Sequence, residues 1–198
     1  MTAAHYSANT MYHIVNLRVI SSGERSQKSE RTVVSEPRVR GHGVVIFDSK
    51  FGNTEKVARS LASGLKIAGV RATCLNVKDV QVGSLIEYDV IAVGAPTQAL
   101  TASKPIKDFL LQMEGVQNLR GKYGFAFDTR FRSRLARSGA KFIEKKLTQL
   151  GLEIIRPRQS AIVKKTEGPL EGGEEEAFER IGFDIGTVLA EDRKNRNH

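Results

Sequence analysis

The sequence of 198 residues has a single cysteine, no long apolar run and no clear leader segment. Because Cys74 has no second cysteine to pair with, an internal disulfide is excluded, and its apolar neighbours predict a buried structural thiol. No stretch approaches the roughly 18 consecutive apolar residues of a membrane-spanning helix. The N-terminal apolar run, residues 12–15, is short and is not followed by a small-residue cleavage site. Together these absences predict a cytoplasmic protein.

Acidic residues are in the minority, since 31 lysines and arginines face 22 aspartates and glutamates. A basic balance of this kind suits nucleic acid, an anionic membrane surface or an acidic protein partner. The basic residues are spread along the chain and lack the interleaved aromatic side chains of a surface for single-stranded nucleic acid. We therefore expect no nucleic-acid partner, and we keep peripheral contact with an anionic membrane as an expectation.

The chain divides into three parts by composition. Residues 1–40 are largely polar without a sustained period, which predicts a flexible N-terminal extension. Residues 41–192 have the length and apolar content of one domain, and residues 193–198 form a short basic tail. Four histidines, at positions 5, 13, 42 and 198, have no spacing that suggests a metal site, and we expect none.

Within the domain, apolar runs of strand length alternate with amphipathic segments of helix length. The expected strands are 43–48, 71–77, 89–96, 122–128 and 153–165, the last broken at Pro157. The expected helices are 54–69, 104–114, 132–151 and 172–192. In the first helix, Val57, Leu61, Leu65 and Ile67 are expected on one buried face. The pattern predicts an α/β fold with a doubly wound, five-stranded parallel sheet in a three-layer sandwich.

In such sheets ligands bind beyond the carboxyl ends of the strands, where the strand order reverses. The loop after the first strand consists of small or hydrogen-bonding residues with one aromatic: Ser49, Lys50, Phe51, Gly52, Asn53 and Thr54. It leads directly into a helix, whose first amides are unpaired and carry partial positive charge, so it predicts a phosphate cradle. It has the spacing neither of an ATP-type phosphate loop nor of a dinucleotide-binding loop. A helix start capped by Asn53 or Thr54 is the alternative.

The loop resembles the FMN phosphate loop of flavodoxins, usually written [TS]-x-[TSY]-G-N-T. Ser49, Gly52, Asn53 and Thr54 match this motif, and Phe51 departs from it. The resemblance extends over the order of elements from about residue 43 to residue 189. It implies a flavodoxin-like fold and FMN as the cofactor.

The resemblance also implies two segments beside the flavin ring. Residues that follow the third strand should line one face and edge of the ring: Ala95, Pro96, Thr97, Gln98 and Ala99. No glycine lies between positions 95 and 103, which argues against strong stabilisation of the half-reduced ring by a peptide flip. The second segment follows the fourth strand: Asp128, Thr129, Arg130 and Phe131. Phe131 is expected to stack on the ring, with packing in the core as its alternative.

Several functions fit this pattern. The first is an FMN-binding electron carrier without catalytic side chains, which docks by electrostatics to a redox partner protein or reductase. Arginines at 130, 132 and 134 should make its flavin less reducing than in an acidic flavodoxin. The alternative is a flavodoxin-like enzyme of the quinone reductase or protoporphyrinogen oxidase type. A module that has lost the flavin is a third possibility. A phosphate-accepting receiver domain is disfavoured because Asp48 stands without a second acidic residue beside the first strand.

Overall fold

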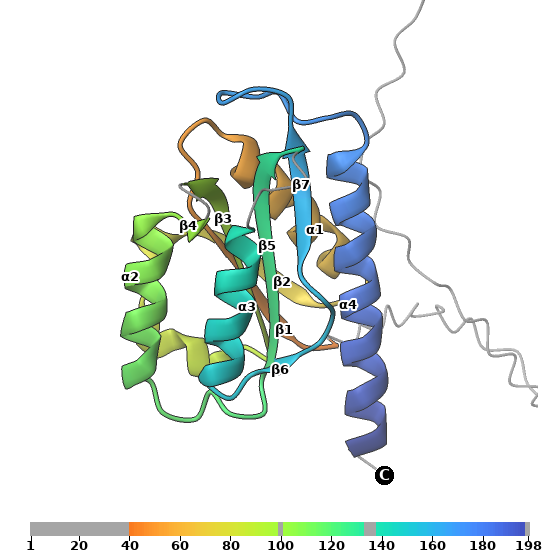
Figure 1. Cartoon of the computed structure of the whole chain (residues 1–198). Coiled ribbons are helices and arrows are strands. Elements are labelled where there is room, and N and C mark those ends of the chain that lie inside the picture. The colour runs from red at the N-terminus through yellow and green to blue at the C-terminus, as the bar shows by residue number, and fades with distance from the viewer. Residues whose placement is uncertain (1–39, 99–100, 133–137, 197–198) are drawn as a thin grey trace, which may run out of the picture. The chain divides into compact units, whose positions relative to one another are not determined.

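The computed structural model describes residues 40–98, 101–132 and 138–196. Residues 1–39 of the predicted N-terminal extension, Ala99 and Arg134 therefore lie outside the described residues. The described chain contains one mixed sheet flanked by helices on both faces (Figure 1). No helix in these ranges is long and apolar enough to cross a membrane.

The sheet has the doubly wound order that the sequence predicted. Its strands are β1 (His42–Phe47), β2 (Arg71–Asn76), β3 (Val90–Gln98), β4 (Thr101–Ala102), β5 (Tyr123–Phe131), β6 (Glu153–Ile154) and β7 (Gln159–Val163). The parallel strands lie in the order β2-β1-β3-β5, and β6 and β7 both pair with β5. β6 and β7 are thus two parts of the predicted fifth strand, interrupted around Pro157. The order reverses between β1 and β3, where a ligand site is expected.

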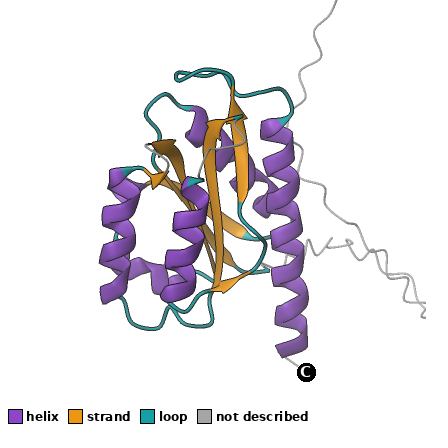
Figure 2. Cartoon of the chain, viewed as in Figure 1, coloured by secondary structure: helices purple, strands orange, loops and turns teal. Residues whose placement is uncertain are grey.

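Helices form the two outer layers of the sandwich (Figure 2). They are α1 (Asn53–Ile67), α2 (Lys104–Gln112), α3 (Gly139–Gln149) and α4 (Glu174–Arg196), with short 3-10 turns at Val77–Asp79, Val82–Glu87 and Met113–Gly115. α1 and α4 cover one face of the sheet, and α2 and α3 cover the other (Figure 1). Each face has its own apolar core, so the central strands are buried on both sides. The three-layer architecture is confirmed.

Two details of the core differ from the sequence prediction. Val57, Leu61 and Leu65 of α1 are fully buried, but Ile67 is 62% exposed. Each residue turns an α-helix by about 100°, so Ile67 projects about 200° away from Leu65 and faces solvent. Cys74 is partly rather than fully buried, and burial raises the pKa of its thiol to about 11.

The functional strands extend further than predicted. β3 continues through Gln98 because its end pairs antiparallel with β4, and β5 continues through Phe131 because β7 pairs with it up to that residue. The residues predicted as loops after the third and fourth strands are therefore largely strand. At α3 the helix starts later than predicted, since Ser138 is its extended N-cap. α4 continues through residues 193–196, which the sequence predicted as tail.

Candidate functional site

A cleft of about 110 Å³ lies at the carboxyl edge of the sheet. It is lined by residues from the ends of β1, β3, β5 and β7 and from the start of α1: Ser49, Lys50, Phe51, Asn53, Thr54, Pro96, Thr97, Gln98, Thr129, Arg130, Phe131, Val163 and Thr166. This is the reversal point of the strand order, and it unites the three segments that the sequence singled out. Of the predicted residues, Gly52, Ala95 and Asp128 do not line the cleft.

The start of α1 has no side-chain cap. Gly52 is the N-cap residue, with φ of 81°, a left-handed conformation that glycine adopts without strain. The predicted alternative of a cap by Asn53 or Thr54 is wrong, because both side chains have other partners. The Asn53 amide donates to the Glu167 carbonyl at 3.0 Å, and the Thr54 and Thr129 hydroxyls share a hydrogen bond of 2.8 Å. Within the described ranges no side chain caps the helix, which leaves its first turn open to an anion.

Two buried polar atoms of the cleft residues have no hydrogen-bond partner. They are the Ser49 hydroxyl oxygen and the Arg130 Nε. A buried polar atom without a partner costs about 1–3 kcal/mol, so proteins rarely retain one without a reason. Both atoms can donate a hydrogen bond, and both belong to residues that face the same cleft. The cleft therefore suits a ligand that is rich in acceptors and carries negative charge.

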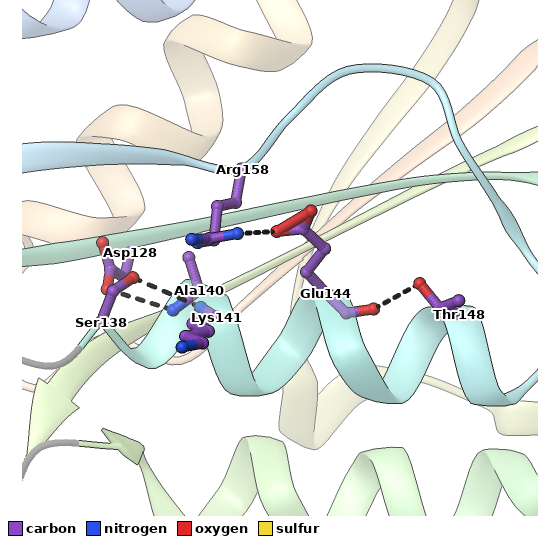
Figure 3. A network of polar contacts seen from close by, with 7 residues as sticks. All are labelled: Asp128, Ser138, Ala140, Lys141, Glu144, Thr148 and Arg158. Carbon is purple, nitrogen blue, oxygen red and sulfur yellow. Dashed lines mark hydrogen bonds and ion pairs between the residues drawn. The ribbon is translucent and has the colours of Figure 1, made fainter.

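Asp128 holds the cleft walls together from behind. Its carboxylate is fully buried, and Oδ2 accepts hydrogen bonds from the Thr97 hydroxyl (2.7 Å), the Ser138 hydroxyl (2.8 Å) and the Ala140 amide (3.1 Å). Figure 3 shows Ser138 and Ala140 at the start of α3 beside this carboxylate. Thr97 also accepts from the Gly139 amide at 2.9 Å. Asp128 thus fixes the end of β3 to the start of α3, and a carboxylate there suits the helix dipole.

Two aromatic side chains border the cleft. Phe51 is 42% exposed and Phe131 is 47% exposed, so packing of Phe131 in the core, the predicted alternative, is wrong. The Lys50 ammonium lies 5.1 Å from the centre of the Phe51 ring, within the range of a cation–π contact. The cleft therefore presents flat apolar surface and positive charge at the same edge.

One wall of the cleft was not predicted from the sequence. Val163 and Thr166, at the end of β7 and just after it, also line the space. The rule that ligands bind at the carboxyl ends of strands applies to the fifth strand as well and would have indicated this segment. The turn signal of Gly168 and Pro169 shortly after the strand pointed to the same place.

Comparison with known proteins identifies the family. The family model described as flavodoxin matches residues 45–181, more than half of the chain. The chain belongs to the flavodoxin family. A flavodoxin of Clostridium saccharobutylicum is 33% identical over 86 residues, which are 43% of this chain and 53% of that protein. An NAD(P)H dehydrogenase (quinone) of Paracoccus denitrificans is 28% identical over 107 residues, which are 42% of this chain and 51% of that protein.

Both curated relatives match over about half of their own length. Among solved structures, a flavodoxin from the domain Archaea is 25% identical, with a TM-score of 0.65, over 75% of this chain and 98% of that chain. The flavodoxin fold predicted from the sequence is thus confirmed. Membership of this family supports FMN as the cofactor.

The cleft of this flavodoxin-family chain has the donors that FMN requires. The uncapped start of α1 and the unpartnered Ser49 hydroxyl suit a phosphate, and the exposed ring of Phe131 suits a flat aromatic system. A volume of about 110 Å³ is below the ~300 Å³ of a site that encloses a whole ligand of drug size. We therefore expect part of a bound flavin to remain open to solvent. No group of three His, Cys, Asp or Glu side chains suited to a metal ion occurs in the described ranges.

Proposed function

We propose that this protein binds FMN in the cleft and carries electrons, one or two at a time, between partner proteins. The observation that carries the proposal is the start of α1 without a side-chain cap, facing a cleft that also contains the unpartnered Ser49 hydroxyl. Together they form a site for an anion at the switch point of a doubly wound sheet. Bound FMN would supply the redox chemistry, and the protein supplies binding, orientation and electrostatics.

The roles of the cleft residues follow from their positions. Ser49 and the first amides of α1 hold the phosphate, and Lys50 adds positive charge beside it. Thr97 and Gln98, at the end of β3, would hydrogen-bond the polar edge of the ring, and the exposed Phe131 would stack on it, since all three line the cleft. Ala95 and Asp128 support these segments from the buried side without touching the cofactor.

Arg130 sets the electrostatic environment of the cofactor. Its Nε is buried without a partner, and Arg130 takes part in none of the ion pairs within the described ranges. Positive charge beside the cleft favours the reduced cofactor, which carries more negative charge. We propose a flavin that is less reducing than in an acidic flavodoxin, and a redox partner or reductase that docks by complementary charge in the cytoplasm.

An FMN-dependent quinone reductase is the second candidate. The observation in its favour is the similarity to the NAD(P)H dehydrogenase (quinone) of Paracoccus denitrificans, and the positive net charge would suit a quinone at an anionic membrane. The carrier is preferred because the cleft, at about 110 Å³, is small.

Titration of the apoprotein with FMN and with riboflavin tests the proposal. We expect saturable binding of FMN, followed by flavin absorbance and by calorimetry, with a Kd at least tenfold below that of riboflavin, since the phosphate adds about 1.4 kcal/mol or more. Absence of heat and of bound flavin would contradict FMN binding. Steady-state oxidation of NAD(P)H with a soluble quinone separates the two candidates, because only the enzyme turns over without a partner protein.

A further inference from the structure

The segment that follows β7 forms a hairpin at the mouth of the cleft. Val163 pairs with Leu170 in an antiparallel bridge. The Glu171 amide donates to the Ile162 carbonyl at 2.8 Å, and the Lys164 amide donates to the Pro169 carbonyl at 2.9 Å. These bonds define residues 162–171 as one unit, which we call the β7 hairpin.

The β7 hairpin is hydrogen-bonded to the start of α1. The Asn53 side-chain amide donates to the carbonyl of Glu167, next to Thr166. Gly168 has φ of 107°, and a Cβ at this position would lie 2.6 Å from the Asn53 Oδ1. Only glycine permits this close approach. The α1 start and the hairpin are therefore in direct contact at Asn53.

A second anchor joins the β7 hairpin to the end of β5. The Arg132 guanidinium forms an ion pair with Glu171, with Nη2 to Oε2 at 2.5 Å. The hydrogen bond to Arg132 lowers the pKa of the Glu171 carboxyl. The hairpin is thus held on two sides of the cleft, and Thr166 at its turn lines the space between them.

The hydroxyl groups of the cleft residues differ in whether they have a hydrogen-bond partner within the protein. The Thr54 hydroxyl is bonded to Thr129, whereas the Ser49 hydroxyl has no partner. Thr166 also makes no hydrogen bond through its hydroxyl within the part of the chain that the structure describes. Two residues that line the cleft, Ser49 before α1 and Thr166 after β7, therefore have hydroxyls without a partner in the described ranges, and Thr166 is next to the Glu167 carbonyl that binds Asn53 at the start of α1.

We infer that Thr166 is a phosphate ligand of the bound cofactor, presented by the β7 hairpin and positioned by Asn53. This inference rests on the proposed binding of FMN. The phosphate would be held between the start of α1 on one side and the Thr166 hydroxyl on the other. Asn53 is then a positioning residue: its side chain holds the hairpin through the Glu167 carbonyl rather than capping the helix.

The substitution Thr166→Val, which removes the hydroxyl at nearly constant volume, tests this inference. We expect the Kd for FMN to rise about tenfold and the Kd for riboflavin to stay within about twofold, because only FMN carries the phosphate. Thr166→Ser should restore FMN affinity. Gly168→Ala, which displaces the turn against Asn53, should weaken FMN in the same selective way. The 31P resonance of bound FMN should shift in Thr166→Val.

Thr148→Val is the matched control, since Thr148 lies on α3 and bonds only to the Glu144 carbonyl. The inference is overturned if Thr166→Val binds FMN as the wild type does, or if it weakens riboflavin to the same degree. Failure of the proposed function looks different, because the wild-type protein itself would then bind neither flavin.

Discussion

The two ends of the sheet differ in whether their polar side chains have partners within the protein. At the amino end, the Asp89 carboxylate accepts from the His42 amide at 2.7 Å and pairs with Arg193 at 2.8 Å. Lys122 donates to two backbone carbonyls there, at 2.7 and 2.8 Å. At the carboxyl end lie all of the buried side-chain polar atoms that lack a partner in the described ranges: Ser49 Oγ, Ser103 Oγ, Asp128 Oδ1 and Arg130 Nε.

The two ends of the sheet also differ in the volume of their hollows, and the larger hollow lies at the amino end. The hollow beside Asp89 and Arg193 has about 520 Å³, against about 110 Å³ for the cleft at the carboxyl end. Its carboxylate and its lysine are nevertheless satisfied by the protein itself. Two of these unpartnered atoms, Ser49 Oγ and Arg130 Nε, belong to residues that line the cleft, and they support the proposed ligand site there despite its smaller volume.

Ser49→Asp should have the largest effect, because it places a carboxylate beside the phosphate position. Two like charges about 4 Å apart repel by about 4 kcal/mol at an effective dielectric constant of 20, so we expect the Kd for FMN to rise by at least about 100-fold. Riboflavin should be affected by less than about threefold. The control Ser84→Asp lies in the turn before the amino end of β3. Equal losses for both flavins in Ser49→Asp would refute the phosphate site.

Asp128→Asn and Asp89→Asn compare the two strand-end carboxylates directly. Asp128 is fully buried with three donors, so its loss should lower the free energy of unfolding by about 2–3 kcal/mol and weaken FMN and riboflavin alike. Asp89→Asn removes a half-exposed ion pair and should cost about 1 kcal/mol without changing flavin affinity. Urea unfolding of the apoproteins and flavin titration measure both effects. Unchanged flavin affinity in Asp128→Asn would argue against its positioning role.

Arg130→Met should lower the midpoint potential of the bound flavin, while Arg193→Met at the other end should not. A charge about 8 Å from the ring contributes about 2 kcal/mol at an effective dielectric constant of 20, or about 40 mV for a two-electron couple. Spectroelectrochemical titration measures this shift. A rise in potential on removal of Arg130 would contradict the proposed electrostatics.

Glu171→Gln should have the smallest effect, because the ion pair with Arg132 lies at the surface. Since the pKa of Glu171 is lowered in the folded protein, the pair stabilises the fold above the ordinary carboxyl pKa, and its contribution is lost as pH falls through the lowered value. The difference in melting temperature between wild type and variant should therefore be present near pH 7 and vanish on acidification. A difference that grows at low pH would exclude this pair as its source.

Much of the architecture was predictable from local pattern. The continuous apolar runs predicted a parallel sheet buried on both faces, and the polar loop after β1 was predicted from its residues and lies at the cleft. The prediction was wrong where pairing with a distant segment determines the local structure. Gln98 and Phe131 are strand because β4 and β7 pair with them, and neither pairing is visible in the local sequence. Ile67 was misplaced because an apolar residue near a helix end was counted without its angle around the helix.

The sequence by itself determined the layered fold, the family and the loop at the start of α1, because apolar periodicity and turn chemistry act over short stretches of chain. Only the tertiary structure decided which of those polar side chains remain open to a ligand. Asn53 and Thr54 are both committed to partners more than 70 positions away, whereas Ser49 is not. The physical reason is that a hydrogen-bonding group is satisfied by whatever folding brings beside it, and parallel sheets bring together strand ends that lie far apart in the chain.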